Sequence, residues 1–314
     1  MTEMRTAQEL RPTWSLVLAG GEGSRLHSRT RRDDGVAVPK QFFPLLEDGS
    51  TPLDDTLARM TPLAPSKQTV VVVAEHHRAF WTPLLSKGLS EQWLVQPESR
   101  GTGLAALLGL LRIERQAPDA IVIMTPADHG IRHTDSWRTS LRRAVSWADA
   151  GGVTLVGVPG EGLDDGYGWI VPTEPIGSDV ARVGTFVEKP DPRTARALRE
   201  AGALISTFVV VGRVIDLIGL FELAIPGLVA MTQRHVKSPL AWLPRQIKKF
   251  FGEIPTIDFS ADVLATVPQR LLVLRAADCG WSDLGTPERL DGHLAKPVPA
   301  AKPMALKLAM SHAA

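Results

Sequence analysis

The fold of this chain is decided by the stretch Trp14-Ser-Leu-Val-Leu-Ala-Gly-Gly-Glu-Gly-Ser-Arg-Leu26. An apolar run ends in Gly20, Gly21 and Gly23, which predicts a buried first strand passing into a loop whose backbone can approach a ligand closely. Without Cβ atoms, successive N–H groups can point at one anion, and the guanidinium of Arg25 matches phosphate oxygens. The stretch therefore predicts a phosphate-binding loop.

A second basic group follows in Pro39-Lys40-Gln41-Phe42. A glycine turn that only joins a strand to the next element is the alternative, and Arg25 together with Lys40 makes it the less favoured one. Two other phosphate-binding motifs do not match. A dinucleotide fingerprint needs a third glycine where Leu26 stands, and a Walker A loop needs Gly-Lys-Ser/Thr, which is absent.

Composition indicates a globular protein with a substantial core. The 314 residues are 44% hydrophobic and 22% charged, which favours neither a disordered nor a membrane protein. The net charge of +1 gives no general reason to expect a nucleic-acid partner. The positive charge is local, in a basic segment around Arg29, Arg31 and Arg32 beside the glycine loop, where substrate attraction and a solvated loop are about equally favoured.

The expected compartment is the cytoplasm. Cys279 is the only cysteine, so no intramolecular disulfide can form, which fits a reducing environment. The first dozen residues are charged and lack the apolar core of a signal peptide. No apolar run approaches the length of a membrane span.

Apolar periodicity predicts a mostly parallel, Rossmann-like α/β sheet with ligand loops along one edge. Buried strands are expected over 69–74, 93–96, 120–125, 153–158, 183–189 and 270–275, helices over 52–60, 104–113, 135–148, 193–201 and 260–266, and a helical subregion over 214–251 broken at Pro226, Pro239 and Pro244.

The segment Gln96-Pro-Glu-Ser-Arg-Gly-Thr-Gly103 precedes a long apolar helix. Free N–H groups and the helix dipole at such an N-terminus favour a polar or anionic ligand. An ordinary helix N-cap by Thr102 explains the same residues about equally well.

Two aspartates stand where a metal ion could be held. Asp128 follows a buried strand in Pro126-Ala-Asp-His129, and Asp283 lies in Trp281-Ser-Asp-Leu-Gly285. Ligands gather at the carboxyl ends of parallel strands, and two carboxylates from separate loops suit a magnesium ion that takes its other ligands from water and phosphates. Each aspartate could instead only stabilise a turn. His129 is expected to help fix its loop.

The second half offers two further ligand segments. Gly166 and Gly168 allow a tight backbone beside Tyr167, the only tyrosine, and a hairpin without a ligand-binding role is the alternative. Val183-Gly-Thr-Phe-Val-Glu-Lys-Pro190 ends a strand with Glu188 and Lys189. Because adjacent strand residues face opposite sides, these two need a bulge or a strand end to serve one ligand, and an exposed surface pair is the alternative.

The glycine loop with Pro-Lys-Gln-Phe, and then Pro-x-Asp-His, Gly-Tyr-Gly, Phe-Val-Glu-Lys-Pro and Trp-Ser-Asp-x-Gly in this order, resemble the sugar-1-phosphate nucleotidyltransferases, in the mannose-1-phosphate guanylyltransferase branch. The resemblance implies a nucleotide-diphospho-sugar transferase (GT-A-like) fold. It implies a catalytic domain over 1–294 without a β-helix or cupin extension, followed by a loose Ala/Pro/Lys-rich tail over 295–314.

The resemblance also implies a Mg2+-dependent reaction of GTP with mannose 1-phosphate that gives GDP-mannose and pyrophosphate. The catalytic residues implied by the resemblance are Arg25, Lys40, Asp128, Lys189 and Asp283, of which Asp128 and Asp283 would bind the metal. The implied nucleotide-binding residues are Ala19, Gly20, Gly21, Gly23, Ser24, Gln96, Glu98, Arg100, Gly101 and Thr102. The implied sugar-binding residues are Tyr167, Gly168, Glu188, Lys189 and Ser206.

Three departures from the family pattern stand out. Ser206 replaces a sugar-binding asparagine, Gly103 replaces an alanine and is expected to loosen the helix start, and an insertion occupies 27–38. These leave open another sugar 1-phosphate or base, or a regulatory homologue that binds nucleotide sugars without turnover. A Rossmann dehydrogenase is a distant third alternative. Whether the chain forms a homodimer is also open.

Overall fold

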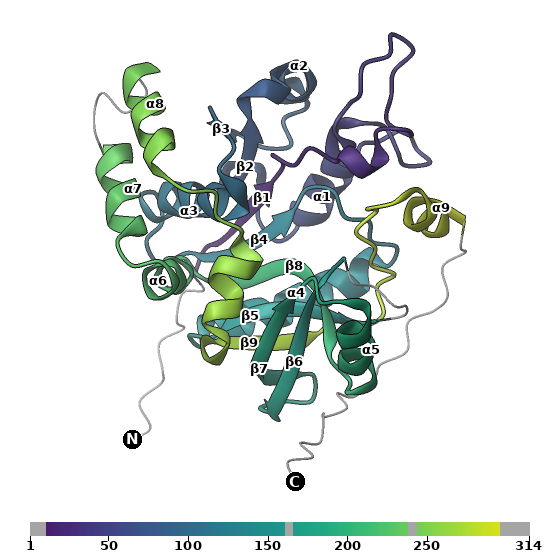
Figure 1. The fold of residues 1–314 in the computed structure, drawn as a ribbon, viewed down its shortest axis with the longest axis vertical. Coiled ribbons are helices and arrows are strands. Elements are labelled where there is room, and N and C mark those ends of the chain that lie inside the picture. The colour runs from purple at the N-terminus through teal and green to yellow at the C-terminus, as the bar shows by residue number, and fades with distance from the viewer. Residues whose placement is uncertain (1–10, 161–165, 238–243, 296–314) are drawn as a thin grey trace, which may run out of the picture.

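The computed structural model describes residues 11–160, 166–237 and 244–295. Nine strands in these ranges form one sheet in the order β3-β2-β1-β4-β8-β5-β9-β7-β6 (Figure 1). The strands are β1 (Thr13–Leu18), β2 (Thr69–Ala74), β3 (Gln92–Gln96), β4 (Ile121–Pro126), β5 (Val153–Pro159), β6 (Gly168–Pro175), β7 (Val180–Glu188), β8 (Leu204–Arg213) and β9 (Leu271–Arg275).

Most of the α-helices lie close to the expected positions, whereas those over 78–81 and 287–295 were not predicted. They are α1 (Pro52–Met60), α2 (Arg78–Trp81), α3 (Gly101–Glu114), α4 (Thr134–Asp149), α5 (Pro192–Glu200), α6 (Val214–Ala224), α7 (Leu228–Lys237), α8 (Pro244–Glu253) and α9 (Pro287–Ala295). In α1 the predicted bounds are confirmed. Thr51 and Asp54 form a reciprocal capping box, and Pro52 opens the helix at a position that needs no N–H donor.

The sheet is mixed, so the prediction of a mostly parallel sheet is wrong beyond its first half. β3, β2, β1 and β4 are mutually parallel, as crossovers through helices require. β8 then runs antiparallel between β4 and β5, and β6 with β7 forms an antiparallel hairpin. β8 also pairs with β6, which closes β8, β5, β9, β7 and β6 into a ring.

The two faces of the sheet's first half are covered by different helices. Leu16 on β1 packs in one buried cluster with the residues of α3, while its neighbour Val17 packs with Leu53 and Leu57 of α1. Successive residues of β2 also pack alternately in these two clusters, and all six residues of the strand are buried. A strand covered on both faces needs apolar residues at every position, which explains the uninterrupted apolar run.

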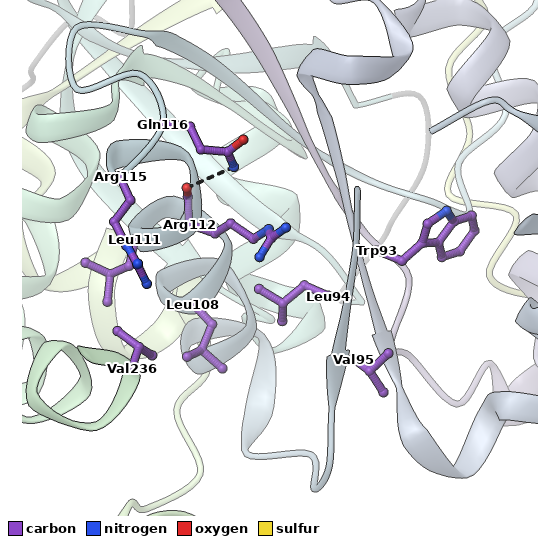
Figure 2. Close-up of a pocket in the computed structure, with 9 residues that line it drawn as sticks. All are labelled: Trp93, Leu94, Val95, Leu108, Leu111, Arg112, Arg115, Gln116 and Val236. Carbon is purple, nitrogen blue, oxygen red and sulfur yellow. Dashed lines mark hydrogen bonds between the residues drawn. The ribbon is translucent and has the colours of Figure 1, made fainter. Parts of the chain in front are cut away.

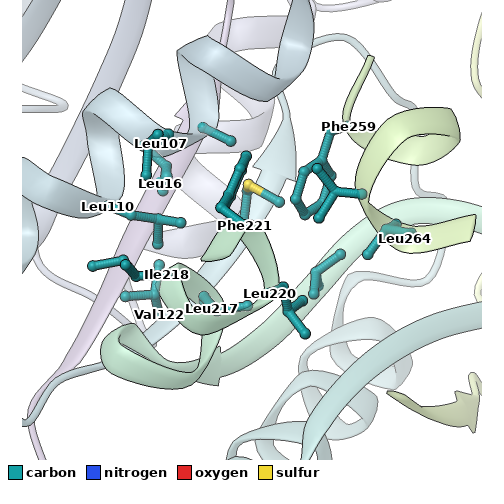
Figure 3. Packing of buried hydrophobic residues seen from close by; sticks show 14 of the residues in the cluster. Leu16, Leu107, Leu110, Val122, Leu217, Ile218, Leu220, Phe221, Phe259 and Leu264 are labelled. Carbon is teal, nitrogen blue, oxygen red and sulfur yellow. The ribbon is translucent and has the colours of Figure 1, made fainter. Parts of the chain in front are cut away.

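The predicted helical subregion is present as α6, α7 and α8, on the α3 side of the sheet (Figure 1). Pro226 lies between α6 and α7 and Pro244 begins α8, whereas Pro239 lies outside the described residues. Figure 3 shows Phe221 of α6 beside Phe259, with ring centroids 5.5 Å apart. None of the helices within the described ranges is both long and apolar enough to cross a membrane.

The segment after Ile257 differs from its predicted form. The expected helix over 260–266 is a π-helical turn, Phe259–Val263, followed by a 3-10 turn, Leu264–Thr266. Asp258 is the N-cap of this segment, because its side chain accepts hydrogen bonds from the N–H groups of Ser260 and Ala261. Phe259 lies in the core, while Ser260 lines a cavity.

The tail predicted over 295–314 lies outside the described residues, apart from Ala295 at the end of α9.

Phe221→Ala is expected to lower the free energy of unfolding by about 3–5 kcal/mol, because it leaves a cavity beside Phe259 in the fully buried core. Urea denaturation followed by circular dichroism measures the change. Ile215→Ala on the same helix, an exposed position, is the matched control and should change stability by less than about 0.5 kcal/mol. Equal effects at the two positions would contradict the packing described here.

Candidate active site

A cavity of about 350 Å³ opens between the glycine loop, the start of α3 and the ends of β4, β6, β7 and β8. It brings together predicted site residues from Gly20 near one end of the chain to Asp283 near the other. Those that line it are Gly20, Gly21, Arg25, Gln96, Gly101, Thr102, Asp128, Tyr167, Gly168, Glu188, Ser206 and Asp283. The predicted site residues that lie outside its wall are Ala19, Gly23, Ser24, Lys40, Glu98, Arg100 and Lys189.

Gly23 is fixed by two constraints. Its φ of 61° lies in the left-handed region, and a Cβ there would stand 2.8 Å from the Lys40 nitrogen and 2.9 Å from Lys40 Cβ. Any side chain at this position would therefore collide with the Pro-Lys-Gln-Phe segment. The glycine loop and that segment, although separate in the sequence, are packed together as one unit.

Gln41 fixes the glycine loop through hydrogen bonds from its side chain. Its buried side-chain amide donates to the carbonyl oxygens of Ala19 at 3.0 Å and Gly21 at 2.7 Å. With those two carbonyl groups satisfied inside the protein, the Gln41 amide fixes the path of the loop backbone along the cavity wall.

Lys40 and Arg25 differ in how they present their charge. The Lys40 side chain is only 6% exposed, and its Nζ lies 3.0 Å from Asp128 Oδ2 and donates to the carbonyl oxygen of Asp283. The Arg25 side chain is 62% exposed and lines the cavity, with Nη2 4.0 Å from Asp283 Oδ2. Lys40 thus joins the two aspartate loops, while Arg25 faces the cavity.

The loops that carry Asp128 and Asp283 are tied to each other through their backbones. Gly130 and Ser282 form a two-way bridge with N–H···O distances of 2.8 and 3.0 Å. The Trp281 indole also donates to His129 Nδ1 at 3.2 Å. His129 therefore helps to fix its loop, as expected, by accepting a hydrogen bond from the other loop.

Asp283 is held from three sides. Tyr167 Oη donates to Oδ1 at 3.0 Å, the Gly285 N–H donates to the same oxygen at 3.0 Å, and Arg289 Nη1 donates to Oδ2 at 2.9 Å. The Arg289 guanidinium also lies over the Tyr167 ring, 4.4 Å from its centroid. The sequence motifs gave no indication of Arg289, because it reaches Asp283 from the start of α9.

Both aspartates are held in the ionised form. Burial alone would raise the pKa of Asp128, but Lys40 and His129 outweigh it and lower that pKa. Burial likewise opposes ionisation of Asp283, and His129, Arg289 and Lys40 together lower its pKa. Two ionised carboxylates on one cavity wall are the hard oxygen donors that Mg2+ prefers, so this donor set fits the ion.

The start of α3 is built around Ile257. Gly101 has a φ of 82°, the Gly103 N–H donates to the Ile257 carbonyl oxygen at 2.9 Å, and the Ile257 N–H donates to the Arg100 carbonyl oxygen. A Cβ at Gly103 would lie 2.4 Å from Ile257 Cγ2. Glycine at 103 is therefore required by the close packing against Ile257, while its loosening of the helix start stays a prediction.

Thr102 does not cap α3. The N-cap residue is Arg100, without a side-chain cap, and Thr102 Oγ1 instead accepts a hydrogen bond from the Phe259 N–H at 2.9 Å. This bond joins the helix start to the π-helical turn, and it leaves the α3 N-terminus facing the cavity through Gly101 and Thr102.

Gln96 presents an unused donor in the same region. Its side chain is buried at the end of β3 and lines the cavity, and its Nε2 has no hydrogen-bond partner within the described residues. A buried amide without a partner is costly unless a ligand satisfies it. Glu98 and Arg100, by contrast, pair with each other at 3.2 Å.

The other end of the cavity carries Glu188, with Lys189 beside it. Lys189 follows the last residue of β7 with a φ of 44°, and its Nζ lies 3.1 Å from Glu188 Oε1. The predicted strand end is confirmed, and the left-handed backbone lets neighbouring side chains meet. Burial raises the pKa of Glu188, opposed by Lys189. Gly168 leaves room for Glu188, since a Cβ there would stand 2.7 Å from Oε2.

Ser206 lines the cavity beside an unusual strand residue. Thr207 points away, donating to the Val156 carbonyl oxygen at 2.7 Å, and Phe208 follows with a φ of 62°. The Phe208 N–H donates to Ser206 Oγ at 3.2 Å, and Phe208 itself lines the cavity. Phe208 and Ser260 are cavity residues that sequence motifs did not indicate, because they arise from the local backbone distortion and the π-helical turn.

A second cavity, of about 520 Å³, lies between β3, α3 and α7 (Figure 2). Its wall is formed by Trp93, Leu94, Val95, Leu108, Leu111, Arg112, Arg115, Gln116 and Val236. Among these described residues there is no carboxylate and no member of the predicted site, so the larger size of this cavity does not make it the candidate active site.

Comparisons with known proteins identify the family of this chain. The model of the nucleotidyl transferase family matches residues 14–292. The chain is 30% identical over 288 residues to the mannose-1-phosphate guanylyltransferase ManC of Salmonella typhimurium, covering 87% of this chain and 58% of that protein. It is 32% identical over 197 residues to a mannose-1-phosphate guanylyltransferase of Escherichia coli K12, covering 60% of this chain and 40% of that protein.

The chain therefore spans about two fifths to three fifths of the length of these curated relatives. Among solved structures, it is similar to the crystal structure of a mannose-1-phosphate geranyltransferase from Thermus thermophilus. That similarity has a TM-score of 0.78 and 26% sequence identity, and it covers 91% of this chain and 80% of the other.

Gly103→Ala is expected to lower the free energy of unfolding by about 1–3 kcal/mol, because the new methyl group overpacks against Ile257. Thermal or urea unfolding measures the change. Ile257→Ala removes the Cγ2 atom, so the double variant should lose less stability than the two single variants added together. Strict additivity would show that this contact does not explain the glycine.

Proposed function

Because this chain belongs to the nucleotidyl transferase family, we propose that it transfers a nucleotidyl group from a nucleoside triphosphate to a sugar 1-phosphate. GTP and mannose 1-phosphate are the proposed substrates, and GDP-mannose and pyrophosphate the products. The names of the two relatives support this choice. The observation that carries the proposal is one cavity lined by a glycine loop, two ionised aspartates and the Glu188 carboxylate.

The proposed reaction is a direct displacement. An oxygen of the sugar phosphate attacks the α-phosphorus of the triphosphate, and the bond from that phosphorus to the oxygen bridging it to the β-phosphorus breaks. Pyrophosphate leaves with the bonding electron pair. Such chemistry depends on positioning the two phosphates and offsetting their charge, so no nucleophile from the protein is needed.

The glycine loop and Arg25 are proposed to bind the triphosphate. Gly20 and Gly21 line the cavity without side chains, which lets phosphate oxygens approach the backbone. The exposed Arg25 guanidinium can move onto the leaving pyrophosphate, because its contact to Asp283 is long, at 4.0 Å. Ala19, Gly23 and Ser24 are proposed to contribute backbone groups of the same loop.

Asp128 and Asp283 would hold Mg2+, and the bound ion would offset charge on the phosphates. Lys40 orients both groups: it pairs with the Asp128 carboxylate and donates to the Asp283 backbone. Its buried ammonium also adds positive charge close to the phosphates. Arg289 helps to lower the pKa of the Asp283 carboxyl group, and the hydrogen bonds from Arg289 and Tyr167 fix its orientation.

The nucleobase is proposed to lie near the start of α3. Gln96, Gly101 and Thr102 line that part of the cavity, and Gln96 Nε2 has no partner among the described residues. Glu98 and Arg100, which pair with each other, are proposed to lie beside the base. Since an amide can both donate and accept hydrogen bonds, Gln96 can bind a base edge directly.

The sugar phosphate is proposed to lie at the opposite end. Glu188 would accept hydrogen bonds from sugar hydroxyls, Lys189 would bind the sugar's phosphate, and Tyr167 and Gly168 would shape the wall. Ser206 has a shorter reach than an asparagine and already accepts a bond from Phe208. Since Ser206 differs from asparagine in this way, another sugar 1-phosphate is the second candidate substrate.

Pyrophosphate release by the purified full chain with Mg2+, across a grid of nucleoside triphosphates and sugar 1-phosphates, tests the proposal. Turnover is expected with GTP and mannose 1-phosphate, because both relatives are named mannose-1-phosphate guanylyltransferases. Turnover with a different pair would correct the substrates. Binding of GDP-sugars without any turnover would overturn the proposed activity in favour of a regulatory role.

Asp128→Asn and Asp283→Asn are each expected to lower kcat by about 100-fold or more, because each removes a charged group that would stabilise the transition state. Steady-state assays across a Mg2+ titration measure the loss. Asp278→Asn, an exposed aspartate near the Asp283 loop, is the matched control. Full activity of either variant at low Mg2+ would refute the metal assignment.

A further inference from the structure

A compact group of ligand-type side chains lies outside the cavity, at the carboxyl end of β2. His76 and His77 belong to the 3-10 turn Glu75–His77, and Glu22 reaches them from the glycine loop. His76 Nε2 lies 2.7 Å from Glu22 Oε1, and His77 Nε2 lies 3.4 Å from Glu22 Oε2. Two imidazoles therefore point their Nε2 atoms at one carboxylate.

The spacing of these groups suits a single ion. One ligand atom from each of the three residues falls within 4.8 Å of the others. The two imidazole rings have centroids 4.0 Å apart and are tilted by 56°. His77 is buried, and its other ring nitrogen, Nδ1, has no partner within the described residues, so the polar contact of this ring is directed at Glu22.

We propose that Glu22, His76 and His77 bind a divalent transition-metal ion of the zinc class. Two imidazole nitrogens and one carboxylate oxygen are the donor set that Zn2+ accepts at about 2.0–2.2 Å. Mg2+ prefers oxygen ligands, so this site differs in chemistry from the pair Asp128 and Asp283. Glu22 also does not line the substrate cavity.

The neighbouring side chains of Arg78 and His27 do not bind the Glu22 carboxylate. Arg78, which follows His77, is engaged by Glu75 through bonds of 2.7 and 2.8 Å. His27 contacts the Glu22 backbone carbonyl at 3.2 Å and leaves the carboxylate to His76 and His77. The Glu22 oxygens therefore face imidazole nitrogens, which an ion can bridge.

Occupancy of the site would join the glycine loop to the end of β2. Glu22 stands between Gly21, whose carbonyl group accepts a hydrogen bond from Gln41, and Gly23, which packs against Lys40. An ion bound to Glu22 and to two residues of a neighbouring strand end would restrict that backbone. Three protein ligands leave at least one coordination position for water or another ligand.

Zinc titration of the full chain, without an affinity tag and after removal of metal by a chelator, tests the site. Calorimetry in excess Mg2+ is expected to give one equivalent of bound Zn2+. Co2+ in place of Zn2+ should develop visible absorption from a nitrogen-bound ion. Glu22→Gln and His76→Gln should each weaken zinc binding by at least about tenfold. Mutation of residues outside the coordination shell already lowers metal affinity by about that factor, and these variants remove a ligand itself.

Matched variants distinguish this site from its surroundings. Glu75→Gln removes the adjacent carboxylate and His27→Gln the adjacent imidazole, and both should retain the zinc affinity of the unmodified chain. Asp128→Asn should retain it as well. Glu22 and His76 are largely exposed, so their variants are expected to fold, which circular dichroism checks.

Two results would overturn the proposal. The first is a chain that binds no Zn2+, or binds it equally well after Glu22→Gln and His76→Gln. The second is zinc binding that is lost in Asp128→Asn, which would place the ion at the carboxylates of the cavity.

Discussion

The close contact between Gly23 and Lys40 is the constraint on which the site depends. Because no Cβ fits between them, the glycine loop can lie directly on the segment that carries Lys40. The Lys40 ammonium is then buried where it meets Asp128 and the Asp283 backbone. Losing one partner of a buried ion pair is costly, since it leaves an uncompensated charge. One glycine and one lysine thereby connect the glycine loop with both aspartate loops.

The candidate site is distributed over the two halves of a mixed sheet. The parallel half supplies the glycine loop, Gln96 and Asp128 at the carboxyl ends of its strands, where α/β sheets bind ligands. The half that closes into a ring supplies Tyr167, Glu188 and Ser206. The Gly130–Ser282 bridge joins the Asp128 loop to the Asp283 loop. The proposed phosphate-binding and sugar-binding groups therefore share one cavity only because the two halves of the sheet lie side by side.

Much of the local structure could be predicted from the chain alone. The apolar run 69–74 predicted β2, and the pattern over 52–60 predicted α1 with its bounds. The direction of β8 could not be predicted in this way, because the periodicity of a strand is the same in parallel and antiparallel pairing. The close contact of Gly103 with Ile257 could not be predicted for a similar reason, since it joins residues that are distant in sequence.

The sequence by itself determined the motifs, the first half of the sheet and most of the residues that line the cavity, because these depend on residue type and short-range spacing. Tertiary structure alone decided that Lys40 is buried between two aspartate loops, that Arg289 holds Asp283, and that Phe208 and Ser260 join the wall. Those features arise from contacts between segments that are far apart in the sequence and meet only in the packed fold. Residue type and short-range spacing do not give the distances between such segments.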